Sequence, residues 1–180
     1  MNAFEAIVKL YLEEQGYWVR QSAKVHISKE DKKAIGIPSM PTPEVDLVAL
    51  NVKENELILV EAKSFLDSPG VNFESISGND PRQAKRFKLF TNDKFREVVM
   101  KRLQEEYLKQ GLIRQDTKVT LGLAAGHIRS KDDQDKIAEY FKEKGWRLFT
   151  PKQIKETVRK LSQRGWVDDL IVMTAKVVEK

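Results

Sequence analysis

Two neighbouring apolar segments of the chain carry charged side chains inside them. The segment "EVDLVAL", residues 44–50, contains Asp46, and "LILVEAKSF", residues 57–65, contains Glu61 and Lys63. Short apolar runs of this length, bounded by polar residues, are typical of buried β-strands. The polar "NVKENE" between them predicts the turn of a β-hairpin. The hairpin would therefore bring two acids and a lysine together where most side chains are buried.

The register of the hairpin decides whether these residues meet. A turn centred between Lys53 and Glu54 places Asp46 opposite Glu61. Lys63 then shares a face with Glu61, because side chains alternate along a strand. A slip of one residue would separate the two acids.

Two facing, half-buried carboxylates need compensation. They repel each other, and an unpaired charge in a core costs several kcal/mol. Lys63 offsets one charge, whereas a divalent cation between Asp46 and Glu61 would offset both through the oxygen ligands that Mg²⁺ prefers. This predicts a metal site. The alternative is an ordinary Glu61–Lys63 ion pair at a strand end, with Asp46 capping a turn.

Apolar periodicity predicts the elements around the hairpin. Helices are expected at 2–16, 81–90, 92–111, 132–145, 151–165 and 168–180, and strands at 17–27, 45–50, 57–63, 118–128 and 146–150. Prolines 38, 41 and 43 predict an extended loop before the hairpin, and residues 64–80 a long polar loop. The three tryptophans, Trp18, Trp146 and Trp166, are expected in the core.

This order predicts an α/β fold, a mixed β-sheet with helices on both faces. Both predicted hairpin strands are apolar at even and odd positions, as a sheet covered on both sides requires. The length of 180 residues fits one domain, residues 1–180.

Composition limits the chemistry. The chain has no cysteine and only two histidines, His26 and His127, so a metal would be held mainly by carboxylates. The net charge of +5 and pI of about 9.3 favour a polyanionic partner such as nucleic acid. The sequence shows neither an apolar run of ~20 residues nor a signal-peptide pattern, so we expect no membrane association and a cytoplasmic location.

Taken together, the motifs resemble the PD-(D/E)xK nuclease superfamily, especially its Mrr-like and Holliday-junction-resolvase-like branch. The family's signature is an acidic helix residue, an Asp at a strand start and Glu-x-Lys in the next strand. Glu5, Asp46, Glu61 and Lys63 match it at a typical spacing. The resemblance covers about residues 1–127 and implies a restriction-endonuclease-like core of α-β-β-β-α-β order, with extra C-terminal helices in an extension at about 128–180.

The sequence also departs from the family pattern. Pro43 and Glu44 stand where relatives often carry Gly-Glu before the Asp. The loop 64–80 and the segment after 145 have no counterpart that we can assign.

The resemblance implies a metal-dependent DNA endonuclease. Mg²⁺ or Mn²⁺ would be held by Asp46, Glu61 and the carbonyl of Ala62, with Glu5 completing the metal shell. Lys63 would position or deprotonate the attacking water.

On the following helix, Gln83 resembles a supporting glutamine of some branches. Its neighbours Arg82, Lys85, Arg86 and Lys88 could contact DNA phosphates. For each of these residues the simpler alternative is a solvated helical face.

Two further possibilities stay open. The chain could be a nuclease-like domain that binds nucleic acid or a protein without cutting. A homodimer is also compatible with this interpretation, because cutting both strands is easiest with two symmetry-related sites, and the C-terminal helices could supply its interface.

Overall fold

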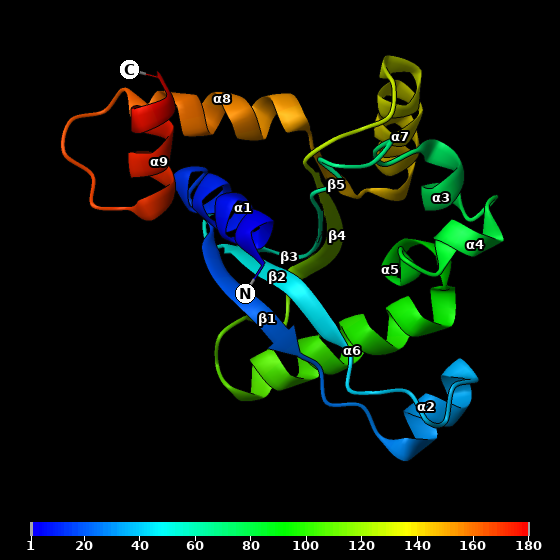
Figure 1. Cartoon of the computed structure of the whole chain (residues 1–180). Coiled ribbons are helices and arrows are strands. Elements are labelled where there is room, and N and C mark those ends of the chain that lie inside the picture. The colour runs from blue at the N-terminus through cyan, green and yellow to red at the C-terminus, as the bar shows by residue number, and fades with distance from the viewer. Residues whose placement is uncertain (1, 180) are drawn as a thin grey trace.

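A computed structural model describes residues 2–179, so Met1 and Lys180, the two ends of the predicted domain, lie outside it. The fold is an α/β arrangement around one five-stranded mixed sheet (Figure 1). The strands lie in chain order, and they are β1 (Trp18–Lys24), β2 (Glu44–Asn51), β3 (Glu56–Lys63), β4 (Lys118–Ala125) and β5 (Arg147–Phe149). The predicted strands are thus all present.

Helices connect and cover the strands. They are α1 (Ala3–Glu14), α2 (Lys29–Ile35), α3 (Phe73–Ser77), α4 (Pro81–Ala84), α5 (Lys88–Thr91), α6 (Asp93–Lys109), α7 (Lys131–Lys144), α8 (Pro151–Ser162) and α9 (Leu170–Glu179). Within residues 2–179 no helix is both long and apolar enough to cross a membrane.

Strand direction follows from the connections. β1, β2 and β3 pair antiparallel, and β2 and β3 are joined by a tight turn. β3, β4 and β5 pair parallel, because the chain returns to the same end of the sheet through α3–α6 and then through α7. The carboxyl ends of β3 and β4 therefore lie side by side at the same end of the sheet.

The hairpin register is confirmed. Leu47 pairs with Val60 and Leu50 with Leu57. These pairs agree with the turn centre that the sequence predicted, but the regular pairing ends before Asp46 and Glu61, so the predicted pairing of these two acids is not part of it.

The sheet is covered on both faces, as predicted. On one face, Leu57 and Leu59 of β3 join a core built with α6 and α7. On the other face, Ile58 and Val60 join a core built with α1 and α8. Glu61 and Lys63 follow the odd-numbered alternation, so they belong to the α6 side of the sheet.

Two helices, α2 and α3, were missed, and α2 is the longer of them. The sequence predicted a strand to residue 27 followed by an extended loop, whereas α2 lies between β1 and β2. Ser28 and Asp31 form a capping box at its start, and Arg102 of α6 binds Asp31 at 2.8 and 3.0 Å. The hydrogen bond from Arg102 and that from the Ser28 amide lower the pKa of Asp31 to about 2.

The predicted helix at 81–90 is wrong in its middle. α4 ends at Ala84 and α5 begins at Lys88, because Phe87 adopts a non-helical backbone and turns into the core. The Thr91 hydroxyl spans the break by donating to the carbonyl oxygens of Ala84 and Phe87, at 2.9 and 3.0 Å.

Other expectations also need correction. The polar loop 64–80 contains the short helix α3, whose first residue, Phe73, donates its amide hydrogen bond to buried Asp133 of α7. Of the three tryptophans, only Trp146 packs into the core, whereas Trp18 and Trp166 are exposed.

A close backbone contact joins the ends of β3 and β4. The Gly126 amide donates to the carbonyl of Lys63 at 2.8 Å. A Cβ on Gly126 would lie 2.4 Å from the Ser64 carbonyl oxygen and 3.0 Å from a ring carbon of Phe4. Glycine is therefore required where β3, β4 and α1 meet.

We expect Gly126→Ala to lower the free energy of unfolding by about 1–3 kcal/mol, since the new methyl group meets backbone that cannot move aside cheaply. Gly165→Ala is the matched control, because a methyl group added there would have no atom within 4 Å. Urea denaturation measures both, and equal stability of the two variants would contradict this packing argument.

Candidate active site

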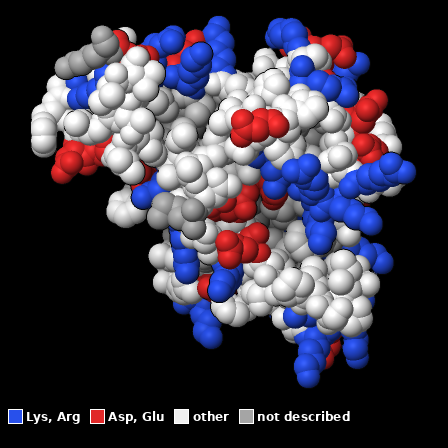
Figure 2. All heavy atoms as spheres, viewed as in Figure 1, with Lys and Arg blue, Asp and Glu red and all other residues white. Residues whose placement is uncertain are grey.

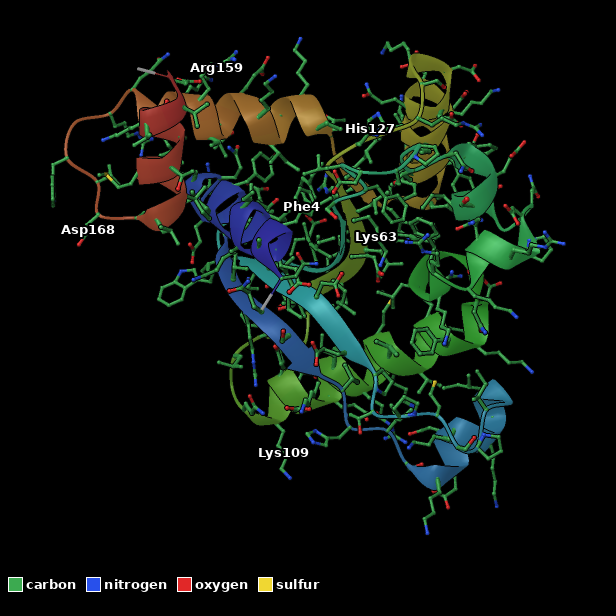
Figure 3. All side chains as sticks on the ribbon, in the orientation of Figure 1. Phe4, Lys63, Lys109, His127, Arg159 and Asp168 are labelled. Atoms are coloured by element: carbon green, nitrogen blue, oxygen red, sulfur yellow. The ribbon has the colours of Figure 1, made fainter. Side chains whose placement is uncertain are left out.

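Four residues predicted from the sequence come together at the carboxyl end of β3. Asp46 comes from β2, Glu61 and Lys63 from β3, and Glu5 from the first turn of α1. Electrostatic coupling links Glu5 to Asp46 and to Glu61. Figure 3 labels Lys63 and also Phe4 of α1, which directly precedes Glu5 in the sequence.

Asp46 lies where the regular strand pattern breaks. Val45 joins the core on the α6 side, whereas Leu47 joins the core on the α1 side, although alternation would put both on one face. In β1, Ser22 is the residue that the register sets opposite Asp46, and its φ of 50° lies in the left-handed region. Such strained backbone clusters at functional sites.

This irregularity lets the Asp46 carboxylate reach the neighbouring strand. Its Oδ2 accepts a hydrogen bond from the Ala62 amide at 2.8 Å, in the place of a strand carbonyl. Asp46 therefore bridges β2 and β3 and does not cap a turn. Among the described residues no hydrogen bond reaches the second oxygen, Oδ1.

Glu61 and Lys63 form a close ion pair. Their side chains are only 15% and 21% exposed, so the pair is largely removed from water. The Lys63 ammonium also lies 5.9 Å from the ring centre of Phe87. The break between α4 and α5, which turns Phe87 inward, thus helps to position Lys63.

The pKa values of three acids at this site are raised. Burial is the main cause for Glu61, and the charges of Asp46 and Glu5 add to it against the lowering effect of Lys63. Burial also raises the pKa of Asp46, in spite of the Ala62 hydrogen bond and the Lys63 charge. For Glu5 the causes are burial and then the charge of Asp46. The site holds more negative charge than it can neutralise.

A cationic wall faces the acids. A cavity of about 220 Å³ is lined by two acids, Glu44 and Glu61, and by three basic residues, Lys85, Arg86 and Lys88. Figure 2 shows acidic side chains gathered in a hollow in the middle of this face, with Lys and Arg side chains beside it. The cavity therefore has carboxylates that could bind a metal cation and basic side chains that could bind an anion such as phosphate.

Arg86 is fixed within that wall. Its guanidinium lies 4.5 Å from the ring centre of Phe65, and its Nη1 donates to Gln83 Oε1 at 3.4 Å. Gln83 thus contacts Arg86, and no hydrogen bond among the described residues joins it to the acids. Arg82 is exposed on α4 and does not border the cavity.

Two residues of the site were missed in the sequence. Glu44 borders the cavity and raises the pKa of both Asp46 and Glu5. Its position two residues before Asp46 in one strand was a usable signal. Phe65 has a φ of 45° and supports Arg86, but only the folded chain brings the two together.

The donor chemistry suits a hard divalent cation. Asp46 and Glu61 supply carboxylate oxygens in a place short of positive charge, and oxygen ligands are those that Mg²⁺ and Mn²⁺ take. Among residues 2–179, however, no three His, Cys, Asp or Glu side chains are close enough to hold one ion together. Glu61 faces Lys63 and would have to turn toward Asp46 to share a cation.

Comparison with protein-family models, curated proteins and solved structures finds no match to this chain.

We expect Asp46→Asn to stabilise the protein at pH 7 by about 0.5–2 kcal/mol. The raised pKa means that ionisation of Asp46 opposes folding, whereas the amide still offers Ala62 an acceptor. The gain should shrink as the pH falls toward 3.8, the ordinary value for Asp46, and vanish below it, where the carboxyl is protonated in both states.

Urea denaturation between pH 3 and 8 checks this expectation. Asp116→Asn is the control, because Asp116 is an exposed aspartate paired with Arg114 away from the site. A loss of stability on Asp46→Asn that does not vary with pH would contradict the proposed charge excess.

Proposed function

We propose that this chain is a metal-dependent DNA endonuclease of the PD-(D/E)xK nuclease superfamily, with a restriction-endonuclease-like core. One observation carries the proposal, namely that Asp46, Glu61 and Lys63 lie together at the carboxyl end of β3, with Glu5 near enough to interact electrostatically with both acids. These are the four residues on which the sequence resemblance rests. The basic wall beside them supports a polyanionic substrate.

Phosphodiester hydrolysis needs a nucleophilic water, compensation of charge on the phosphate and a proton for the leaving oxygen. Asp46 Oδ1, Glu61 and the carbonyl of Ala62 would hold Mg²⁺ or Mn²⁺, with Glu5 at its edge. Such a cation supplies Lewis acidity and lowers the pKa of water. The Asp46–Ala62 hydrogen bond would keep the first ligand fixed on the strand that carries the second.

Lys63 would act directly on the reacting atoms. Lys63 Nζ, now paired with Glu61, would be free to donate to the attacking water or to a phosphate oxygen if Glu61 served as a metal ligand. Its three N–H donors suit both roles. The contact with Phe87 would keep the ammonium near the sheet edge after the pair opens.

The basic wall would bind the DNA backbone. Lys85, Arg86 and Lys88 border the cavity beside Glu61, so they could pair with phosphates that flank the scissile bond. Arg86 is pre-oriented by Phe65 and Gln83, which lowers the entropy lost on binding. Such contacts with phosphates would contribute affinity that does not depend on the base sequence of the DNA.

A second function is a nuclease-like domain that binds DNA without cutting it. Two observations favour it: Glu61 is already paired with Lys63, and among the described residues no three His, Cys, Asp or Glu side chains are close enough to hold one ion. In that case the basic wall would bind DNA, and the acids would have no role in chemistry.

Cleavage separates the two functions. Plasmid, linear, four-way-junction and single-stranded DNA would be incubated with Mg²⁺, Mn²⁺ or EDTA. We expect cutting with a divalent cation and a loss of roughly 100-fold or more in rate for Glu61→Gln, which keeps the side chain's size but removes its charge.

Glu97→Gln on the exposed side of α6 serves as the control and should cut at the wild-type rate. DNA affinity is measured in parallel by fluorescence anisotropy. Tight, salt-dependent binding with no product from any substrate would support the non-cutting function and overturn the endonuclease.

A further inference from the structure

The C-terminal part of the chain exposes an unusual amount of apolar surface. The arm formed by residues 163–179, comprising a loop and α9, projects from one corner of the molecule (Figure 1). Leu170 is 82% exposed and Val178 80%, and Trp166, Met173 and Val177 are exposed as well. Leu170 and Val178 border one cavity beside α9, whereas Trp166 and Met173 border another. Exposed apolar surface of this size is typical of interaction sites.

Beside this arm lies an apolar groove. It has a volume of about 770 Å³ and runs between α9 and α1, with α8 joining them. Phe4 and Ile7 of α1, Val158 of α8, and Leu170 and Val178 of α9 line it. Its walls are helices, and side-chain ridges on a further helix can pack into such a surface.

The rim of the groove is positively charged. Lys152, Lys155 and Arg159 border it from α8, at spacings of three and four residues that place them on one helix face. Glu179 is the only acid that borders the groove among the described residues, and it is bound by Arg159 and by Ser162. The groove is therefore apolar at its centre and basic along one edge.

The charges along the groove indicate which kind of partner would bind there. A second copy of the chain would bring an equally basic rim toward this one, and like charges placed together disfavour an interface. An acidic partner would instead gain both burial and charge complementarity. The open, helix-walled shape suits a helix better than a small ligand, which is usually buried on most sides.

We propose that the groove binds an amphipathic helix of another protein. Its apolar residues, spaced i, i+3, i+4 and i+7, would cover Phe4, Val158, Leu170 and Val178, and its Asp or Glu residues would face Lys152, Lys155 and Arg159. This inference does not depend on the proposed nuclease activity.

Designed peptides test the groove with the full chain. Each has about 18 residues, or five helical turns. One carries a leucine stripe with Glu elsewhere, the second the same stripe with Lys, and the third the Glu composition with the leucines shuffled off the stripe. By anisotropy, the acidic striped peptide should bind at least tenfold more tightly than either of the others.

Surface variants locate the binding. Leu170→Glu and Val178→Glu should each weaken binding of the acidic peptide by fivefold or more, and Lys155→Glu should shift preference toward the basic peptide. These positions are at the surface, so folding should be preserved, and thermal unfolding checks that it is. Leu112→Glu is the matched control, because Leu112 is 49% exposed and does not border the groove.

Three results would overturn the proposal. Equal binding of the acidic and shuffled peptides would show that no helical stripe is recognised. Self-association that is abolished by Leu170→Glu and that the acidic peptide does not inhibit would assign the groove to a second copy. Binding to phosphatidylserine vesicles that is lost in Leu170→Glu, without binding of the acidic peptide, would assign the arm to a membrane surface.

Discussion

The site depends on one electrostatic constraint, which is that the carboxylates of Asp46 and Glu61 are largely buried beside the ammonium of Lys63, with Glu5 near enough to interact with both acids. Burial raises the pKa of Glu5, Asp46 and Glu61, and the acids raise one another's pKa further. Such an arrangement opposes folding and persists only because the rest of the fold stabilises it. Two apolar cores, one on each face of the sheet, supply that stabilisation.

The local backbone and packing around the acids hold them in this arrangement. The break in alternation at Asp46 turns its carboxylate into the sheet, where the Ala62 amide binds it. Gly126 lets the end of β4 approach Ser64 and Phe4, so that α1 and Glu5 can lie at the same edge. The turn at Phe87 places a ring beside Lys63. The irregular backbone at Asp46, the close packing at Gly126 and the helix break at Phe87 therefore all surround the acids in the folded chain.

The sequence predicted much of this. The polar turn at residues 51–56 determines the hairpin register, so the sequence was enough to predict the pairing of Leu47 with Val60 and of Leu50 with Leu57. The apolar residues on both sides of each strand predicted a sheet covered on both faces, because alternation is a property of the local backbone. These predictions rest on interactions between residues that are close in sequence or in the same strand.

Other features depended on contacts between distant residues. The helix α2 is held by Arg102, which lies 71 residues after Asp31 in the sequence. Because α2 directly follows an apolar strand, the sequence predicted a strand and a loop there. The helix break at 85–87 arises because Phe87 is drawn into the core, which helical propensity does not register. The pairing of Arg86 with Phe65, the break in alternation at Asp46 and the exposure of Trp18 and Trp166 likewise follow from tertiary packing.

The charge excess at Asp46 and Glu61 is the central claim, and Mn²⁺ binding tests it most directly. Titration calorimetry near pH 6, in buffers of different ionisation enthalpy, gives both the affinity and the number of protons released. Because a cation displaces protons from acids whose pKa is raised, we predict that Mn²⁺ binds one site with release of protons, that Asp46→Asn loses this binding, and that Asp116→Asn retains it. Absence of Mn²⁺ binding, or binding that is unchanged in Asp46→Asn, would contradict the account.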